Sequence, residues 1–173
     1  LLDFFLTLSK DYDFDNQEGL NDGLSWRFFT DGVMGGLSQG TVKKHNIHGI
    51  QCYKMSGDVT TENNGGFIQI RLDLNPKIEI NKYDGLYIKI YGNNQKYYLH
   101  IRTGLTLAPW QYYSHSFIAN NKWTTIKTNL KDFKRSNFYQ PKKLNNQKIK
   151  TIGLVAGFDN YKADICLAEI GLF

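Results

Sequence analysis

Apolar and polar residues alternate through most of this chain. In the segment 66–72, Ile68, Ile70 and Leu72 would share one face of an extended strand, and Arg71 would lie on the other. A period of two residues is the signature of a β-strand with one buried face. The alternation dominates from Leu24 onward, and it predicts further strands at 49–55, 86–91, 98–102, 112–118, 123–128, 149–155 and 163–170.

Turn-forming residues separate these segments, as in 63–66 and 92–94. We count nine or ten short strands and no long helix, which predicts an all-β, two-sheet antiparallel jelly-roll sandwich with its aliphatic faces inward. One domain is expected over residues 12–173, after an N-terminal extension at 1–11. Helical turns are predicted at 16–20 and 131–133, and a surface loop at 135–147.

The strand faces opposite the aliphatic residues carry polar and aromatic side chains. Such a face is either the solvated side of a sheet or a binding surface, because Tyr and Arg combine contact area with hydrogen bonding. We expect Arg71 and Arg102 to share it, where a sugar or an acidic peptide could contact both. Its members are Gln69, Arg71, Tyr87, Lys89, Tyr91, Tyr98, His100, Arg102, Tyr112 and Ser114.

Two glycine-rich segments, 31–40 and 62–66, are predicted to be loops. Neither matches a dinucleotide fingerprint or a phosphate-binding loop. We expect Asp31 to lie near Asn63 and Asn64 and to brace the two loops by hydrogen bonds, and Asn64–Gly65 is a strong hairpin signal. The same polar groups could instead line a site.

The segment 105–112 combines apolar and aromatic residues between turn signals. Trp110 is the first candidate for an anchor of a partner, since Trp is enriched among residues that dominate interface energy. The alternative is that Trp110 packs over the end of the sandwich. Val33, Met34, Ala108 and Pro109 are further candidates for exposed loop tips.

The net charge is +5, but the lysines are scattered and densest at 122–150, as in a solvated loop or a surface for an acidic partner. No nucleic-acid-binding motif is present, so no nucleic-acid partner is predicted. No apolar run reaches the ~20 residues of a membrane span. No intact signal or transit peptide is visible, and the protein is expected to be soluble in a bacterial cytoplasm, a periplasm or an organelle.

The sequence contains no constellation that predicts catalysis. The four histidines lack metal-ligand spacing, and no nucleophile motif is present, so we expect no enzyme activity, no metal and no cofactor. Cys52 and Cys166 are expected to be buried free thiols. They could pair only if their strands are neighbours.

Two long segments carry a resemblance to a known family. Residues 26–40 (WRFFTDGVMGGLSQG) and 57–71 (GDVTTENNGGFIQIR) are similar to the signature of the Complex I intermediate-associated protein 30 family. Shorter matches include 83–85, 97–99 and 152–154. The chain departs from the family pattern at 92–94, where Gly-Asp-Gly is common, and at 129–130, where Pro-Phe is common.

The resemblance implies a galactose-binding-like β-sandwich and a role in assembling respiratory complex I. The predicted function is therefore a non-enzymatic assembly factor or chaperone that binds a protein, such as a respiratory complex intermediate. The alternative is a carbohydrate-binding module that holds an oligosaccharide on its polar sheet face. The candidate binding residues are Asp31, Met34, Asn63, Asn64, Arg71, Tyr98, His100, Arg102, Trp110 and Tyr112.

Overall fold

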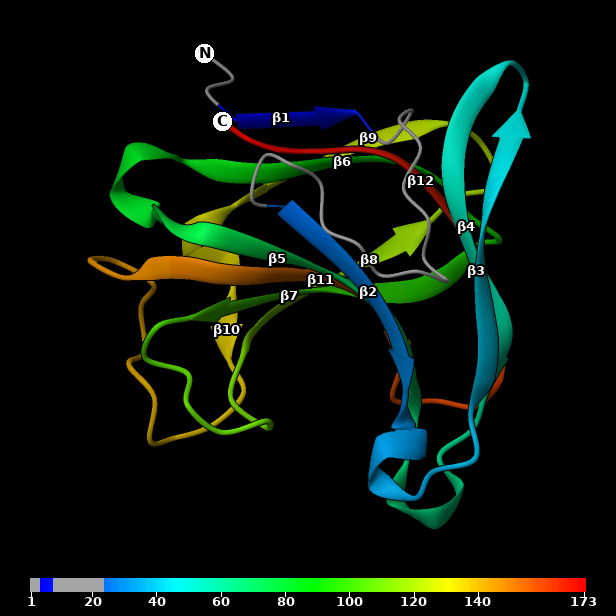
Figure 1. Ribbon diagram of the computed structural model, residues 1–173, viewed down its shortest axis with the longest axis horizontal. Coiled ribbons are helices and arrows are strands. Elements are labelled where there is room, and N and C mark those ends of the chain that lie inside the picture. Colours follow the sequence, from blue (N-terminus) through cyan, green and yellow to red (C-terminus); the bar gives the residue numbers. More distant parts are fainter. Residues whose placement is uncertain (1–3, 8–23) are drawn as a thin grey trace.

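The computed structural model describes residues 4–7 and 24–173, which form two antiparallel β-sheets packed face to face (Figure 1). Each sheet has six strands. The arrangement is a jelly-roll sandwich, as the alternation predicted. Within the described ranges, no helix has the length and hydrophobicity that are needed to cross a bilayer.

The first sheet, called here the back sheet, has the long C-terminal strand at its centre. Its strand order is β3-β4-β12-β6-β9, and β1 pairs with the last part of β12. The strands are β1 (Phe4–Thr7), β3 (Gln39–Ile47), β4 (Ile50–Val59), β6 (Gly85–Tyr91), β9 (Thr124–Asn129) and β12 (Tyr161–Leu172).

The second sheet, called the front sheet, has the order β10-β8-β7-β11-β5-β2. Its strands are β2 (Leu24–Thr30), β5 (Phe67–Glu79), β7 (Gln95–Thr103), β8 (Tyr113–Ala119), β10 (Lys134–Arg135) and β11 (Lys148–Gly157). Four short 3-10 turns connect strands: η1 (Asp31–Met34), η2 (Glu62–Asn64), η3 (Ile80–Lys82) and η4 (Leu130–Asp132).

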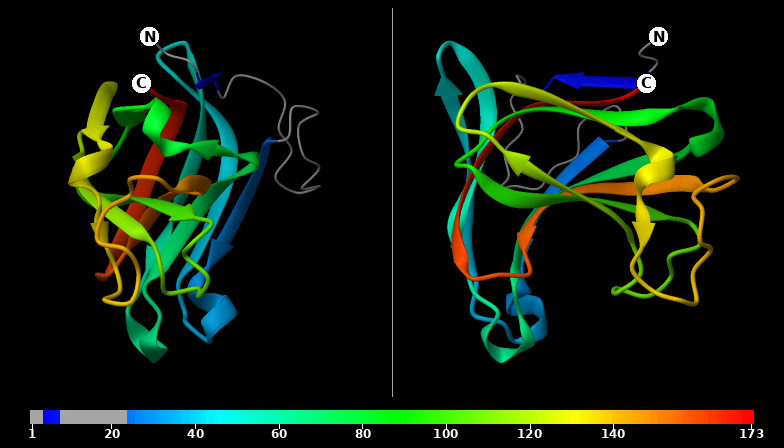
Figure 2. Two further views of the ribbon diagram at one scale, coloured as in Figure 1. Left: turned by 90° about the vertical axis from the view of Figure 1, so that its left-hand side faces the viewer. Right: turned by 180° about the vertical axis from the view of Figure 1, so that it is seen from behind.

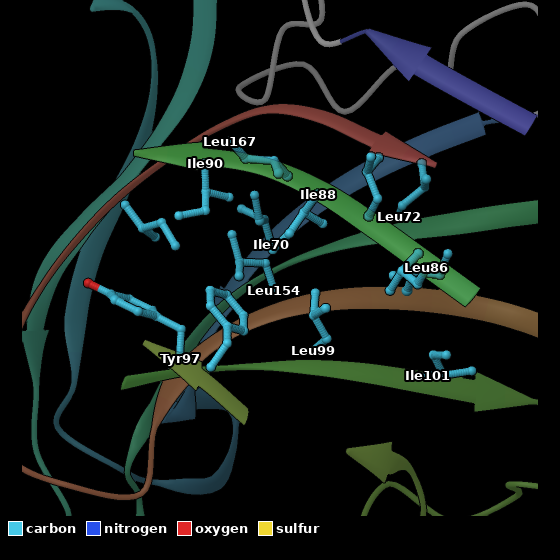
Figure 3. Close-up of a cluster of buried hydrophobic side chains, with 14 of the residues drawn as sticks. Ile70, Leu72, Leu86, Ile88, Ile90, Tyr97, Leu99, Ile101, Leu154 and Leu167 are labelled. Atoms are coloured by element: carbon cyan, nitrogen blue, oxygen red, sulfur yellow. The ribbon is translucent and has the colours of Figure 1, made fainter. Parts of the chain in front are cut away.

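Aliphatic side chains from the two sheets meet in one core (Figure 3). These side chains are fully or almost fully buried, and their burial is the main favourable term in folding. The front sheet contributes Ile70, Leu72, Leu99, Ile101 and Leu154, and the back sheet contributes Leu86, Ile88, Ile90 and Leu167.

The structure confirms the strands predicted from alternation and corrects several details. The described residues form twelve strands rather than nine or ten, because β1, β3 and the two-residue β10 lack a clear alternating signal. The turn at η2 is not a hairpin, since it carries the chain from β4 in the back sheet to β5 in the front sheet. The helical turn expected at 131–133 is η4, whereas the one expected at 16–20 lies outside the described residues.

Cys52 and Cys166 are buried as expected, but the prediction that both thiols are free is wrong. Their strands β4 and β12 are neighbours in the back sheet, which brings the two Cα atoms to 5.5 Å and allows a disulfide. The bond lies in a small apolar cluster with Ala168 and Trp123, separate from the main core.

Candidate ligand groove on the front sheet

The outer face of the front sheet forms the floor of a groove of about 780 Å³. One wall is the loop 104–112, which lies beside the loop 136–147; the other is formed by η1 and the segment that follows η2 (Figures 1 and 2). The groove is lined by Arg27, Phe28, Phe29, Met34, Gly65, Gly66, Phe67, Gln69, Arg71, His100, Arg102, Pro109, Trp110, Tyr112, Thr151, Gly153, Val155 and Phe158.

Strand register arranges the floor in rows that cross the sheet. Arg27 on β2 pairs with Arg71 on β5, Arg71 pairs with Gly153 on β11, and Gly153 pairs with His100 on β7. Residues two positions away on each strand point to the same face. The flanking rows hold Phe29, Gln69, Val155 and Tyr98 on one side, and Asp73, Thr151 and Arg102 on the other.

Gly153 allows the side chain of Gln69 to lie close to the backbone at the centre of this floor. A Cβ atom at this position would lie 2.8 Å from Oε1 of Gln69, closer than ordinary van der Waals contact. A larger residue at position 153 would therefore displace Gln69, which lines the groove.

Aromatic rings surround the polar floor. The Tyr112 ring stacks on the His100 imidazole, with ring centroids 4.0 Å apart and planes at 12°. Phe158 packs edge-on against Tyr98 with centroids 4.9 Å apart, and its backbone is held in a left-handed conformation with φ of 65°. Trp110 and Phe158 are 64% and 53% exposed, so both present open apolar surface at the rim.

Hydrogen bonds hold the 104–112 wall against the sheet and against the loop that follows β10. Arg102 Nη2 donates to the Ala108 carbonyl at 3.0 Å. Ser136 Oγ donates to the Trp110 carbonyl at 2.7 Å, and Gln140 Nε2 donates to the Tyr112 carbonyl at 2.8 Å. The exposed Trp110 ring is therefore carried by a fixed backbone.

The side chain of Asp31 is buried behind the opposite wall and accepts the hydrogen bonds that hold this wall together. Its carboxylate is fully buried and accepts hydrogen bonds from the Ser38 amide at 3.0 Å, from Ser38 Oγ at 2.6 Å, and from the amides of Gly66 and Phe67. Burial acts to raise the pKa of Asp31, but these bonds stabilise the charged form and lower it below the ordinary value. The charge therefore joins the start of η1, and Ser38 in the loop after it, to the start of β5.

Two glycines of the loops, Gly36 and Gly65, pack directly against Asp31. A Cβ atom at Gly36 would lie 2.3 Å from Asp31 Cγ, and one at Gly65 would lie 2.4 Å from Asp31 Oδ2. Any larger residue would push the carboxylate out of its cage of donors. This close approach accounts for Gly36 and Gly65, while Gly35 and Gly66 have positive φ angles of 83° and 130° that favour glycine.

The titrating groups of the floor are perturbed by burial and by neighbouring charges. Burial and the Arg102 charge lower the pKa of His100 to about 3, so the imidazole is neutral near pH 7. Burial and the charge of Arg27 lower the pKa of Arg71 to about 10, which leaves its guanidinium charged. Burial raises the pKa of Tyr112, and this hydroxyl stays protonated. The floor therefore offers neutral hydrogen-bonding groups together with fixed positive charges.

The described residues include no cluster of three His, Cys, Asp or Glu side chains with the geometry of a metal site. The groove lining itself contains no carboxylate.

The structure brings six of the ten candidate residues together in the groove: Met34, Arg71, His100, Arg102, Trp110 and Tyr112. The alternative that Trp110 packs as a core residue over the end of the sandwich is wrong, because its side chain is 64% exposed. Arg71 and Arg102 lie on one face, as expected, while their role in binding stays a prediction.

Three other candidates lie elsewhere among the described residues. Asp31 is buried behind the wall, and Tyr98 lies beside the groove under Phe158. Asn63 is exposed at η2 with φ of 56°. The bonds to Asp31 that brace the loops are donated instead by the backbone amides of Gly66 and Phe67. The side chain of Asn64 lies outside the described part of the chain.

The polar face expected from alternation belongs to two different sheets. Tyr87, Lys89 and Tyr91 lie on β6 in the back sheet, away from the groove. Sequence reasoning also missed Phe29, Arg27, Thr151 and Phe158 as groove residues. Alternation with Phe28 could have placed Arg27 and Phe29 on the outer face, but nothing local marks Phe158, which follows the end of β11.

Residues 12–168 match a protein family described as Complex I intermediate-associated protein 30. The chain belongs to this family. The match covers nearly all of the sequence and agrees with the resemblance carried by the segments 26–40 and 57–71. A search of curated proteins found no significant match.

Solved structures with the same fold include carbohydrate-binding modules. The family 11 module of the cellulosomal cellulase Lic26A-Cel5E of Clostridium thermocellum superposes with a TM-score of 0.70 at 18% identity, covering 90% of this chain and 89% of that chain. The family 11 module from Clostridium thermocellum in complex with a β-1,3-1,4-mixed-linked tetrasaccharide gives a TM-score of 0.70 at 17% identity, over 98% and 95% of the chains.

A family 30 carbohydrate-binding module gives a TM-score of 0.56 at 13% identity, over 80% of this chain and 92% of that chain. At such identities these similarities establish the galactose-binding-like jelly-roll fold and do not transfer a ligand.

Proposed function

We propose that this protein binds an oligosaccharide in the front-sheet groove and does not turn it over. The observation that carries the proposal is the groove itself, in which aromatic rings surround a row of polar side chains. A concave surface with a few convergent polar groups among apolar walls is the usual form of a small-ligand site. The fold shared with carbohydrate-binding modules is consistent with this function and supports it by analogy alone.

The chemistry of the lining suits a sugar. A pyranose ring has apolar C–H faces and a polar edge of hydroxyl groups. Trp110 and Phe158 offer exposed ring surface at the two rims for the faces. Gln69, Arg71 and Arg102 are only partly buried and offer hydrogen-bonding groups on the floor for the hydroxyls.

The proposal is tested by titrating a panel of tetrasaccharides into the wild-type protein and into Trp110→Ala, by isothermal calorimetry. Because the indole is 64% exposed, the variant should fold normally, while binding should weaken by roughly tenfold or more. Tyr139→Ala removes an aromatic ring that is 89% exposed and does not line the groove, and it should bind like the wild type. Absence of saturable binding across the panel, or equal losses in both variants, would contradict the proposal.

A second function, binding of a protein intermediate during the assembly of respiratory complex I, is supported by the family to which the chain belongs. Exposed apolar residues next to the groove suit such a partner, with Met34 66% and Leu107 86% exposed. Leu107 does not line the groove, so Leu107→Ser separates the two functions. Loss of co-purification of a complex I subunit with unchanged oligosaccharide binding would favour the assembly role.

The Cys52–Cys166 disulfide supports a location in an oxidising compartment, such as a periplasm or the cell exterior, since thiols in the cytosol are kept reduced. Polysaccharides of other cells or of the environment are encountered in such locations. Thiol labelling of the protein in intact cells, before and after reduction, tests whether the bond is formed there.

A further inference from the structure

The groove has an unbalanced positive charge. Three guanidinium groups line it, those of Arg27, Arg71 and Arg102, and no Asp or Glu side chain belongs to the described lining. The nearby carboxylate of Asp73 is occupied by Arg27, which donates to it through Nε and through Nη2, the latter at 3.0 Å. Arg71 and Arg102 are therefore left without a carboxylate partner among the described residues.

The guanidinium groups of Arg71 and Arg102 are held in position by other contacts, but some of their N–H donors have no hydrogen-bond partner in the described part of the chain. Arg102 Nη2 is bound to the Ala108 carbonyl, and the Arg71 guanidinium lies 4.5 Å from the centre of the Phe29 ring. Nε of Arg71 and Nε of Arg102 are both buried and have no hydrogen-bond partner among the residues that the structure describes. Buried donors without partners are rare in proteins and are costly, especially when charged.

The positions of the two guanidinium groups indicate which kind of ligand group could bind them. Arg71 and Arg102 flank β11 from opposite sides, in adjacent rows of the same floor. Burial, and after it the charges of Arg27 and Arg102, lower the pKa of Arg71, while the Asp73 carboxylate acts in the opposite direction. An anion with two acceptor oxygens, such as a carboxylate or a sulfate ester, matches a guanidinium fork, whereas a neutral hydroxyl leaves the charge uncompensated.

We infer that the ligand of this groove is an anionic oligosaccharide, carrying uronate carboxylates or sulfate esters that Arg71 and Arg102 bind. The inference rests on the proposed function and adds the chemical class of the sugar. The aromatic rings at the rims distinguish the site from a simple positive patch, because they provide surface for sugar faces.

The test compares anionic tetrasaccharides with their own neutral forms. The probes are tetragalacturonate and tetramannuronate, each with its carboxyl-reduced counterpart, and a sulfated galactan tetrasaccharide with its desulfated counterpart. Binding is measured by isothermal calorimetry near pH 7 for the wild type, Arg71→Gln and Arg102→Gln. At least one anionic probe should bind roughly tenfold or more tightly than its neutral form, and each substitution should remove most of that difference.

Lys43→Gln provides the matched control, because it removes the same charge from an exposed position on β3 in the back sheet. It should change affinity by less than about twofold, as expected for a distant and screened charge. An equal loss in Lys43→Gln and Arg71→Gln would overturn the inference, since general attraction to a basic protein would then explain the binding.

Three other results separate the failure of the inference from that of the proposed function. Equal or tighter binding of the neutral forms overturns the inference and leaves oligosaccharide binding intact. Absence of binding by every anionic and neutral probe overturns both. Binding of hexaglutamate as tightly as of the best uronate, with the same dependence on Arg71 and Arg102, overturns the inference by identifying an acidic peptide as the ligand.

Discussion

The buried carboxylate of Asp31 is the most informative single position for testing how the groove is built. Asp31→Ala removes the acceptor for four hydrogen bonds, two from Ser38 and one each from the amides of Gly66 and Phe67. The amides of Ser38, Gly66 and Phe67 would lose their acceptor behind the wall, whereas Ser38 Oγ could still donate to the Thr60 carbonyl. The loops on either side of η1 and η2 would lose the group that joins them.

The expected loss of stability follows from these bonds. Hydrogen bonds to a charged group contribute about 1.5–3 kcal/mol each, but they are not additive and the loops can relax toward water. We therefore expect Asp31→Ala to lower the free energy of unfolding by about 4 kcal/mol, a large part of the 5–15 kcal/mol typical of a domain. For a chain of this size that corresponds to about 8–16 °C in Tm. Asp31→Asn keeps one acceptor oxygen and should lose about half as much.

Equilibrium unfolding in urea, followed by circular dichroism, measures the effect. Asp58→Ala is the matched control, since Asp58 is an exposed carboxylate on β4. Its free energy of unfolding should stay within about 0.5 kcal/mol of the wild type. If Asp31→Ala stays within about 1 kcal/mol of the wild type, the hydrogen bonds to Asp31 do not hold the wall, and our account of the glycine-rich loops is wrong.

Two other predictions concern stability. The Cys52–Cys166 bond links residues that are 114 positions apart in the sequence. Its reduction, or the double change Cys52→Ser with Cys166→Ser, should therefore lower the free energy of unfolding by about 3–5 kcal/mol. Equal Tm values with and without reductant would contradict this. His100 has its pKa lowered from 6.5 to about 3, so its neutral form stabilises the fold fully above pH 6.5, and this stability is lost as the pH falls toward 3. Between these two pH values the free energy of unfolding should fall by up to about 1.4 kcal/mol per pH unit. His100→Gln should flatten this part of the curve of stability against pH. An unchanged slope in the variant would show that another group titrates there.

Much of the fold was predictable from the sequence, because burial of one strand face leaves a period of two in the residues themselves. Segments such as 66–72 and 149–155 are strands in the structure, and their aliphatic residues form the core. The placement of Arg71 and Arg102 on the outer face follows from the same periodicity. Family membership was also visible, because the segments 26–40 and 57–71 are long and distinctive.

The candidate site was only half predictable, for a physical reason. Alternation tells which face a side chain occupies but not which strands share a sheet, and so Tyr87 and Lys89 were grouped with residues that lie on the other sheet. Pairing between strands distant in sequence decided the rest. It placed Gly153 between Arg71 and His100, and it joined Cys52 to Cys166.

The sequence by itself determined a β-sandwich with an aliphatic interior and a polar outer face, since these depend on neighbours along the chain. Only the tertiary structure decided that Asp31 supports a wall instead of lining the site, and that Phe158 closes the groove beside Tyr98. Both depend on contacts between segments that are far apart in the sequence. Such contacts produce no periodic pattern of residues that could be recognised from the sequence.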